Sequence, residues 1–477
     1  MITDRFPLLA GSPGIDVASI RPGRLSARGV GLAVAAGVAL GAAYTLSPMA
    51  IWFPLASLAI LRAAGYGLSE RERRWVRGLL IAAIVMRVVA VLILFLWGEP
   101  DIVNTSVKVF FGDEQYGIIR SLRQRNLWLG VPMSSEAFDD VYGSYGKTSY
   151  TLVMAFIQVL IGPAPYGVHL VNTLFYLAGA LLLHRLARQA YGPVPALGSL
   201  VLLLFLPTMA AWSVSALKES LFFLLTVMTF CAALAVVRAP WPWRPGAALI
   251  ALAGIAVMQT FRAGAMQIVL GGMLFGFLLR LATRRYWSLA LAAVVAPLVL
   301  VGALRQPSIQ DAVMVQLRLA AKMHMGHVIT RGHAYKLLDE RLYTHGRSST
   351  DTMTTDEAVR FVGRAMVSFI VVPLPWDLRS RSELAFLPEQ IIWYLLLLSA
   401  AVGLVAGLRR DALVTCILSG YVMVASGVVA LNSGNVGTLV RHRAFALPYL
   451  AVLSALGVAA VLMRVTGTSS PSEPRRS

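Results

Sequence analysis

Two adjacent carboxylates, Asp113 and Glu114, lie in the stretch FFGDEQYGIIRSLRQRNLWLG at residues 110–130, shortly after a long apolar run. A carboxylate within hydrogen-bond reach of a hydroxyl or an amine can accept its proton during nucleophilic attack, which is general-base catalysis. The structural alternatives are an ordinary solvated loop and an N-cap, because Asp is a favoured cap and the helix-forming sequence EQYGIIRSLRQRN follows. A cap accounts for only one of the two acids. Asp113, with Glu114 beside it, is therefore the candidate base.

Cations that could bind an anionic ligand border several other apolar runs. Arginine and lysine bind phosphate oxygens strongly, and more so in a partly dry site. Snorkelling or pairing with another helix is the alternative for Lys218, and interfacial anchoring is the alternative for the two arginines near the C-terminal end. The candidate phosphate ligands are Lys147 in YGKTSY, Lys218 in SALKESLFF, Arg262 at the end of an apolar run, and Arg441 and Arg443 in NSGNVGTLVRHRAF.

The amino-acid composition indicates whether these residues belong to a soluble protein or to a membrane protein. The 477 residues are 57% hydrophobic and only 14% charged, which is too little polar surface for a soluble globule of this length. The formal net charge is +19, but many of the arginines and lysines lie in short stretches between apolar runs, as topology-setting loop charges do. Cys231 and Cys416 both lie inside apolar runs, so neither a disulfide nor a thiolate metal site is expected.

The apolar runs predict an all-α polytopic membrane protein with about twelve transmembrane helices. The outer-face loops are expected to carry short surface or re-entrant helices, among them the apolar stretches at 150–162 and 362–376. The predicted spans are 29–46, 48–64, 77–97, 166–187, 194–212, 217–237, 246–262, 264–281, 287–304, 389–407, 411–431 and 441–463.

The positive-inside rule predicts which loops face the cytoplasm. If neither short apolar stretch crosses, the Arg-rich segments such as SERERRWVR and LRLATRRYW all fall on the cytoplasmic face. Residues 98–148 and 305–388 then lie on the outer face. Asp113, Lys218, Arg262 and the LVRHR segment share that face, so we expect carboxylates and cations to meet in one outer cleft.

These assignments divide the chain into six regions. They are a polar cytoplasmic N-terminus (1–28), two accessory transmembrane helices (29–64), a membrane core with the outer loop 98–148 (65–304), an outer loop region (305–388), the C-terminal transmembrane helices (389–464), and a polar tail expected to be disordered (465–477).

The succession of an outward span, GDEQYGIIRSLRQRNLWLG and the Tyr/Lys stretch YGSYGKTSY resembles membrane glycosyltransferases of the GT-C class. These enzymes use polyprenyl-phosphate-linked sugars and include protein O-mannosyltransferases and the lipid A aminoarabinose transferase. In that class an Asp, often followed by Glu, acts as base in the first large outer loop, and Asp113 and Glu114 match that pair. Lys147 matches, loosely, a lysine that contacts the lipid phosphate, because the prolines of the family element are absent.

The resemblance implies transfer of a sugar from a polyprenyl-phosphate donor to an envelope glycan, lipid or protein acceptor, with no nucleic acid involved. The expected location is a bacterial inner membrane with the active face outward. No cofactor is required, although Asp113 and Glu114 leave room for a divalent cation. His324, His327 and His333 lack a Cys or carboxylate companion, so we interpret them as loop histidines and expect no protein-bound metal.

Two other functions are open. An O-antigen or exopolysaccharide polymerase or ligase would work through outer Arg and His residues and would not need Asp113. A polyprenyl-lipid flippase or transporter ranks third, because the ionisable residues gather at one face and no internal repeat is evident.

Overall fold

The computed structural model describes residues 27–97, 109–143, 148–330, 333–344, 346–376, 384 and 387–466. The chain divides into two compact units. Unit 1 comprises the chain up to residue 144 together with residues 151–174, and unit 2 comprises residues 145–150 and everything from Phe175 onward. Lys147 lies outside the described residues.

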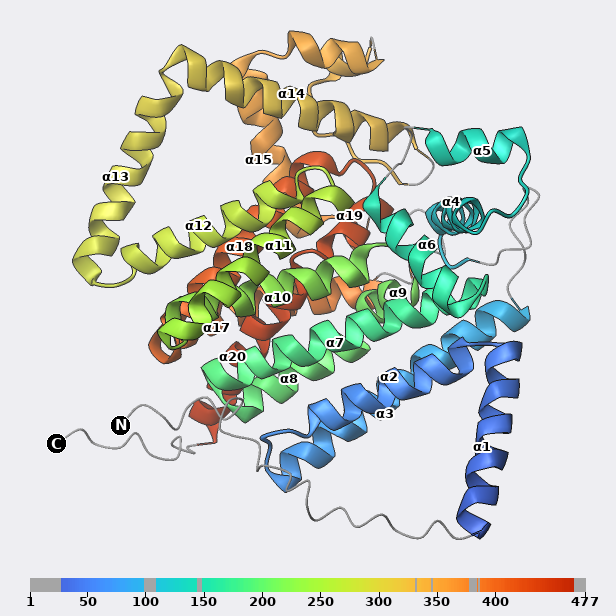
Figure 1. Ribbon diagram of the computed structural model, residues 1–477. Coiled ribbons are helices and arrows are strands. Elements are labelled where there is room, and N and C mark those ends of the chain that lie inside the picture. The colour runs from blue at the N-terminus through green and yellow to red at the C-terminus, as the bar shows by residue number, and fades with distance from the viewer. Residues whose placement is uncertain are drawn as a thin grey trace, which may run out of the picture. The chain divides into compact units, whose positions relative to one another are not determined.

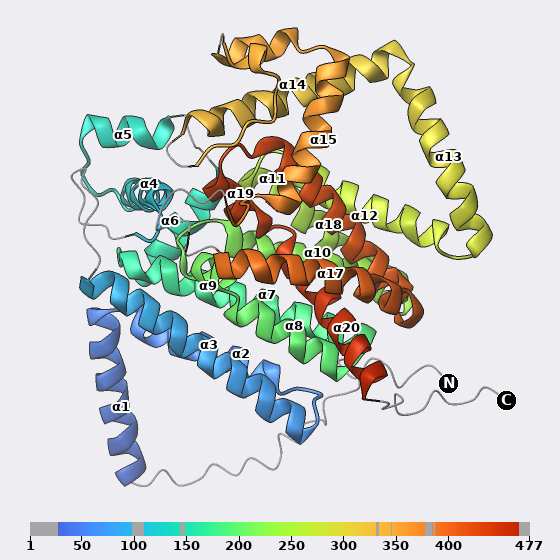
Figure 2. The ribbon, with the colours of Figure 1, turned by 180° about the vertical axis from the view of Figure 1, so that it is seen from behind.

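Unit 1 contains helices α1 to α6 and the first part of α7. Their bounds are α1 (Ala27–Leu46), α2 (Met49–Ala64), α3 (Glu70–Trp97), α4 (Gly112–Trp128), α5 (Ser135–Tyr142), α6 (Ser149–Ile161) and α7 (Pro165–Tyr191). Helices α2 and α3 run side by side in both views (Figures 1 and 2). Met49, Phe53 and Ile161 form a buried apolar cluster, against which side chains of α3, α6 and α7 pack.

Unit 2 continues from the second part of α7 through α8 (Pro193–Phe205), α9 (Pro207–Val214), α10 (Glu219–Arg238), the short 3-10 helix η3 (Trp241–Trp243), α11 (Arg244–Phe261), α12 (Ala265–Ala282), α13 (Tyr286–Leu304) and α14 (Pro307–Ile329). The remaining elements are η4 (Glu340–Tyr343), η5 (Gly346–Thr352), α15 (Thr355–Val371), α17 (Leu387–Arg410), α18 (Ala412–Asn432), α19 (Val436–Arg443) and α20 (Leu447–Val465).

Nine helical segments among the described residues are long and apolar enough to cross a bilayer, or ten if the bent pair α8 and α9 forms one span. The chain is therefore an all-helical, multi-pass integral membrane protein. The predicted number of about twelve is not confirmed, because α2 and the apolar stretch Arg28–Ala42 of α1 are shorter than the other spans. Helix α6, which covers the stretch at 150–162, is also a short apolar helix.

The predicted span at 194–212 is broken. Helix α8 ends at Phe205, Pro207 opens α9, and the two axes differ by 60°. Proline lacks the N–H that would continue the α8 ladder, and it disfavours helical geometry at the residue before it. Leu206 accordingly has φ −62° and ψ 127°.

Glycines allow two helix pairs of unit 2 to approach closely. Helices α17 and α20 meet at Gly403 and Gly457, where an added Cβ atom would overlap the carbonyl oxygens of Leu453 and Ser399. Helices α12 and α18 meet in the same way at Gly276 and Gly420. No hydrophobic driving force acts between helices within a membrane. Small residues at such contacts let the backbones approach closely, and the resulting van der Waals packing stabilises the pair.

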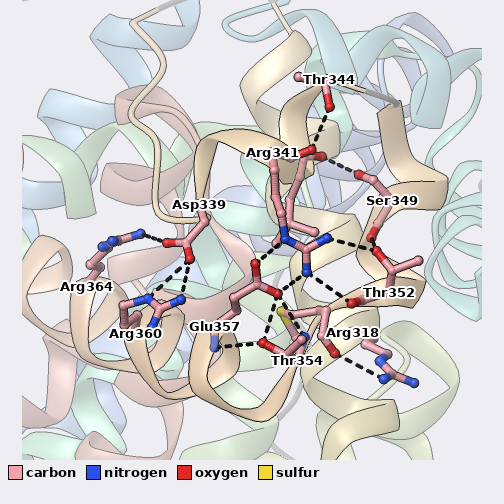
Figure 3. A network of polar contacts seen from close by, with 12 residues as sticks. Arg318, Asp339, Arg341, Thr344, Ser349, Thr352, Thr354, Glu357, Arg360 and Arg364 are labelled. Carbon is pink, nitrogen blue, oxygen red and sulfur yellow. Dashed lines mark hydrogen bonds and ion pairs between the residues drawn. The ribbon is translucent and has the colours of Figure 1, made fainter.

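The region expected as an outer loop, 305–388, is largely helical where the structure describes it. Helix α15 begins with a capping box in which Thr354 and Glu357 bond reciprocally. The Arg341 guanidinium donates to both oxygens of Glu357 and, beside it, Arg360 and Arg364 donate to Asp339 (Figure 3). Hydrogen bonds from the two arginines lower the pKa of Asp339. This ion network fastens η4 to α15.

Replacing Gly403 with Val should lower the free energy of unfolding by roughly 1–3 kcal/mol, because the new side chain must separate α17 from α20. Gly427 of α18 is the matched control, since an added Cβ there meets no atom within 4 Å. Thermal unfolding of the detergent-solubilised chain measures both variants. Equal midpoints for Gly403→Val and Gly427→Val would contradict the close packing.

Candidate functional site

In unit 1, the carboxylate pair sits in the first turn of α4. Phe111 is the N-cap and makes no side-chain capping bond, and α4 begins at Gly112. The alternative of Asp113 as N-cap is therefore wrong, because Asp113 is the second residue of the helix. Negative charge in a first turn still interacts favourably with the helix dipole.

The two carboxylates have different environments. Asp113 is exposed, whereas Glu114 is fully buried. Glu114 Oε2 lies 3.8 Å from His169 Nδ1 and accepts a hydrogen bond of 3.4 Å from the backbone N–H of Phe110. The His169 ring is enclosed edge-on by Phe95 and Phe110. Glu114 thus anchors the start of α4, and Asp113 is the exposed carboxylate of the pair.

Three sets of polar contacts hold α4 within unit 1. Arg120 donates to the carbonyl oxygens of Val141 and Gly143, at the end of α5. Gln158 of α6 donates to Ser121 at 2.7 Å. Arg123 pairs with Asp140 at 2.9 Å, so that acid is engaged within unit 1.

His169 was missed by the sequence analysis. It lies in α7 with Asn172 and Thr173, and all three side chains are fully buried. The spacing of three and four residues puts them on one helical face within an otherwise apolar run. That spacing was the available signal, since polar groups on one face of a membrane helix have partners or a function.

In unit 2, three of the predicted cations come together. Lys218 precedes α10, Arg262 follows α11, and Arg441 lies on α19. The Arg441 guanidinium donates to Glu219 Oε1 through Nε at 3.2 Å and Nη2 at 3.0 Å. Lys218 Nζ donates to the carbonyl oxygen of Phe261 at 3.1 Å. We call Lys218, Glu219, Arg262 and Arg441 the cation cluster.

Aromatic rings surround the cation cluster. Arg262 lies over the ring of Phe445 at 4.5 Å, and Arg441 over Trp212 at 5.4 Å. Arg262 Nη2 is 3.4 Å from His442 Nε2. Cations held against aromatic faces gain an electrostatic attraction while water is excluded.

The cation cluster carries three cations and one carboxylate. Burial lowers the pKa of Lys218, with the nearby Arg262 lowering it further, and burial also lowers the pKa of Arg262. Burial, with Arg262 and Arg441 close by, lowers the pKa of His442 well below its usual value, so this ring is neutral. Lys218, Arg262 and Arg441 each keep some exposed surface. Desolvated, excess positive charge that a ligand can reach is suited to binding an anion.

Arg443 does not join the cation cluster. It is buried, donates to Gln390 Oε1 at 2.8 Å and to the carbonyl oxygens of Phe369 and Val372, and lies over the ring of Trp393 at 4.5 Å. Burial lowers its pKa to about 10. These contacts tie α19 to α15 and α17.

The histidines interpreted as loop residues are placed differently. His324 and His327 lie on α14, and their Nδ1 atoms are each 2.7 Å from a carbonyl oxygen, those of Ser433 and Asn432. Burial lowers the pKa of His324 to about 4. They hold the loop before α19, where Asn435 caps the helix by accepting from Thr438 N. Among the described residues no group of three or more His, Cys, Asp or Glu side chains could hold a metal ion.

Comparisons with protein-family models, with curated proteins and with solved structures found no match for this chain.

Replacing Glu114 with Ala should lower the free energy of unfolding by roughly 1–3 kcal/mol, because the Phe110 N–H and the His169 ring lose a buried partner. Asp113→Ala is the control and should cost less than about 1 kcal/mol, since Asp113 is exposed in the first turn of α4. Thermal unfolding of the purified chain measures both. A larger loss from Asp113→Ala would reverse the roles assigned to the two acids.

Proposed function

We propose that this chain is a membrane glycosyltransferase. It transfers a sugar from a polyprenyl-phosphate donor to a glycan, lipid or protein acceptor of the cell envelope. The observation that carries the proposal is the cation cluster of unit 2, where Arg441 and Arg262 are held by Glu219 and by aromatic rings at the ends of apolar helices. A lipid-linked phosphate presents its charge at that kind of membrane border.

The proposed reaction uses the two types of residue differently. The acceptor hydroxyl or amine attacks the anomeric carbon, and the carboxylate of Asp113 takes its proton. The bond from that carbon to the phosphate oxygen breaks, and its electron pair stays on the departing phosphate. Arg441, Arg262 and Lys218 stabilise this developing charge because they are preorganised in a partly dry site. The role of Asp113 is supported by its exposure and by the resemblance to the GT-C class.

The proposal includes a topology. Helices α1 and α2 cross the membrane as accessory spans in addition to the nine or ten segments, giving about twelve. Asp113 and the cation cluster face outward from a bacterial inner membrane, and the Arg-rich connections face the cytoplasm. Lys147 and Arg443 stay as predicted substrate ligands. The first lies outside the described residues, and the second makes contacts with α15 and α17.

A polymerase or ligase of envelope glycans is the second candidate. The observation that favours it is His442, which lies close to both Arg262 and the ring of Phe445 and can serve such chemistry without a carboxylate base. The two candidates differ in whether Asp113 is needed.

Arg441→Ala should reduce use of the lipid-linked donor about ten- to a hundredfold, the range expected from losing hydrogen bonds to a charged phosphate. Donor use by Arg441→Lys should be intermediate between that of wild type and that of Arg441→Ala, because lysine keeps the charge but loses the bidentate hydrogen bonding of the guanidinium group. The measurement is sugar transfer in membrane vesicles at matched protein levels. Arg409→Ala is the control, since Arg409 is exposed at the end of α17. Equal losses in Arg441→Ala and Arg409→Ala would remove the cation cluster from the reaction.

A further inference from the structure

His442 lies beside the cation cluster and contacts it through Arg262. Its Nε2 atom is 3.4 Å from Arg262 Nη2. A guanidinium group only donates hydrogen bonds, so Nε2 carries the lone pair and the ring proton is on Nδ1. Both side chains pack against the ring of Phe445, whose centroid is 4.5 Å from the guanidinium carbon and 5.9 Å from the centroid of the His442 ring. His442 is therefore a neutral histidine whose lone pair faces a cation.

Positive charge reaches His442 from several elements. The charged or titratable groups that face it are Arg441 of its own helix, Arg262 after α11, Lys218 before α10 and His327 of α14, whose ring centroid is 6.3 Å away. The carboxylate of Glu219 is engaged with Arg441. Burial lowers the pKa of His442 well below its usual value, and the four facing groups lower it further.

An anion bound at the cation cluster changes the balance at Nε2. The contact between Arg262 and Nε2 is long for a hydrogen bond, and a charged phosphate oxygen is a stronger acceptor for that guanidinium than a neutral ring nitrogen. Once Arg262 donates to the anion, Nε2 can hold a proton. Negative charge close to the ring favours the protonated form, because it stabilises the imidazolium. His442 keeps some exposed surface, so solvent can supply that proton.

The charge on the phosphate changes during the proposed sugar transfer. A polyprenyl phosphate that carries a sugar is a diester with one negative charge, whereas the departing polyprenyl phosphate is a monoester with about two near neutral pH. The bond from the anomeric carbon to the phosphate oxygen breaks, and its electron pair stays on that oxygen. The proton of the acceptor goes to Asp113, so a proton on His442 comes from solvent.

We propose that His442 is a further ligand of the departing phosphate, which takes up a proton at Nε2 when a doubly charged phosphate occupies the cation cluster and donates it in a hydrogen bond to that phosphate. The inference rests on the proposed function, and it gives the cation cluster a preference for the doubly charged product over the singly charged donor. The additional positive charge forms only with the ligand, so the site without ligand avoids the cost of one more desolvated cation.

Sulfate tests the proton uptake, because it has the shape and double charge of the phosphate and does not titrate near neutral pH. Methyl sulfate is the matched anion with a single charge. Calorimetric titration of the full chain in nanodiscs of zwitterionic lipid, in two buffers of different ionisation enthalpy, counts the protons taken up. Sulfate binding should take up about one proton near pH 6. Because the anion raises the pKa of His442, sulfate affinity should rise as the pH falls between the pKa without ligand and the pKa with ligand, by up to about tenfold per pH unit.

His442→Gln should bind sulfate without proton uptake and with an affinity that does not depend on pH, because glutamine can accept from Arg262 but cannot become charged. At about pH 6 it should bind sulfate roughly tenfold more weakly than wild type. Methyl sulfate should bind wild type with little pH dependence. His333→Gln is the control and should behave as wild type, since His333 meets α19 through its carbonyl oxygen, which accepts from Val436 N at 2.9 Å.

The possible failures are distinguishable. If wild type binds no sulfate, or if Arg441→Ala binds sulfate as well as wild type does, the proposed function falls and the inference with it. If sulfate binds through Arg441 without proton uptake, the inference alone is overturned. It is also overturned if His442→Gln keeps the uptake or loses sulfate binding at every pH, if His327→Gln removes the uptake instead, or if methyl sulfate takes up as many protons as sulfate.

Discussion

The second unit depends on a helix of only eight residues, α19, whose last three side chains reach three different partners. Arg441 is held by Glu219 of α10, His442 lies against Arg262 after α11, and Arg443 binds the ends of α15 and α17. Successive residues of an α-helix are about 100° apart, so one short helix can distribute side chains in this way. A shift of α19 by one residue would break all three sets of contacts at once.

Buried charged side chains need interaction partners, and this constraint applies to the charged residues of both units. Arg443 satisfies it with backbone carbonyls, Gln390 and aromatic faces. In the cation cluster, Glu219 pairs with Arg441, and Lys218 and Arg262 lie close by. The same constraint applies to Glu114, which is buried beside His169, while Asp113 next to it stays exposed.

The sequence predicted the membrane class and most spans, because apolar run length is set by bilayer thickness. The positive-inside rule alone predicted that Lys218, Arg262 and Arg441 share one face of the membrane, and in unit 2 the three side chains lie close together. The different roles of Arg441 and Arg443 could not be predicted, because they depend on the rotational phase of α19, and α19 was read as part of the last span. Pro207 indicated the 60° break at Leu206. The sequence analysis nevertheless predicted one continuous span at 194–212, because the residues on both sides of the break are apolar. The contact between Arg262 and His442 required the packing of the end of α11 against α19, which no local pattern encodes.

The most direct test of the account is a comparison of wild type with Asp113→Asn, each expressed as the only copy of this chain in its host. Mass spectrometry of surface polysaccharides and glycolipids is the measurement, at matched protein levels. The account predicts loss of one sugar from one class of glycan, because the substitution leaves the fold intact and removes the base. An unchanged glycan profile would contradict base-dependent sugar transfer and would leave the arginine- and histidine-centred polymerase or ligase as the better explanation of the cation cluster.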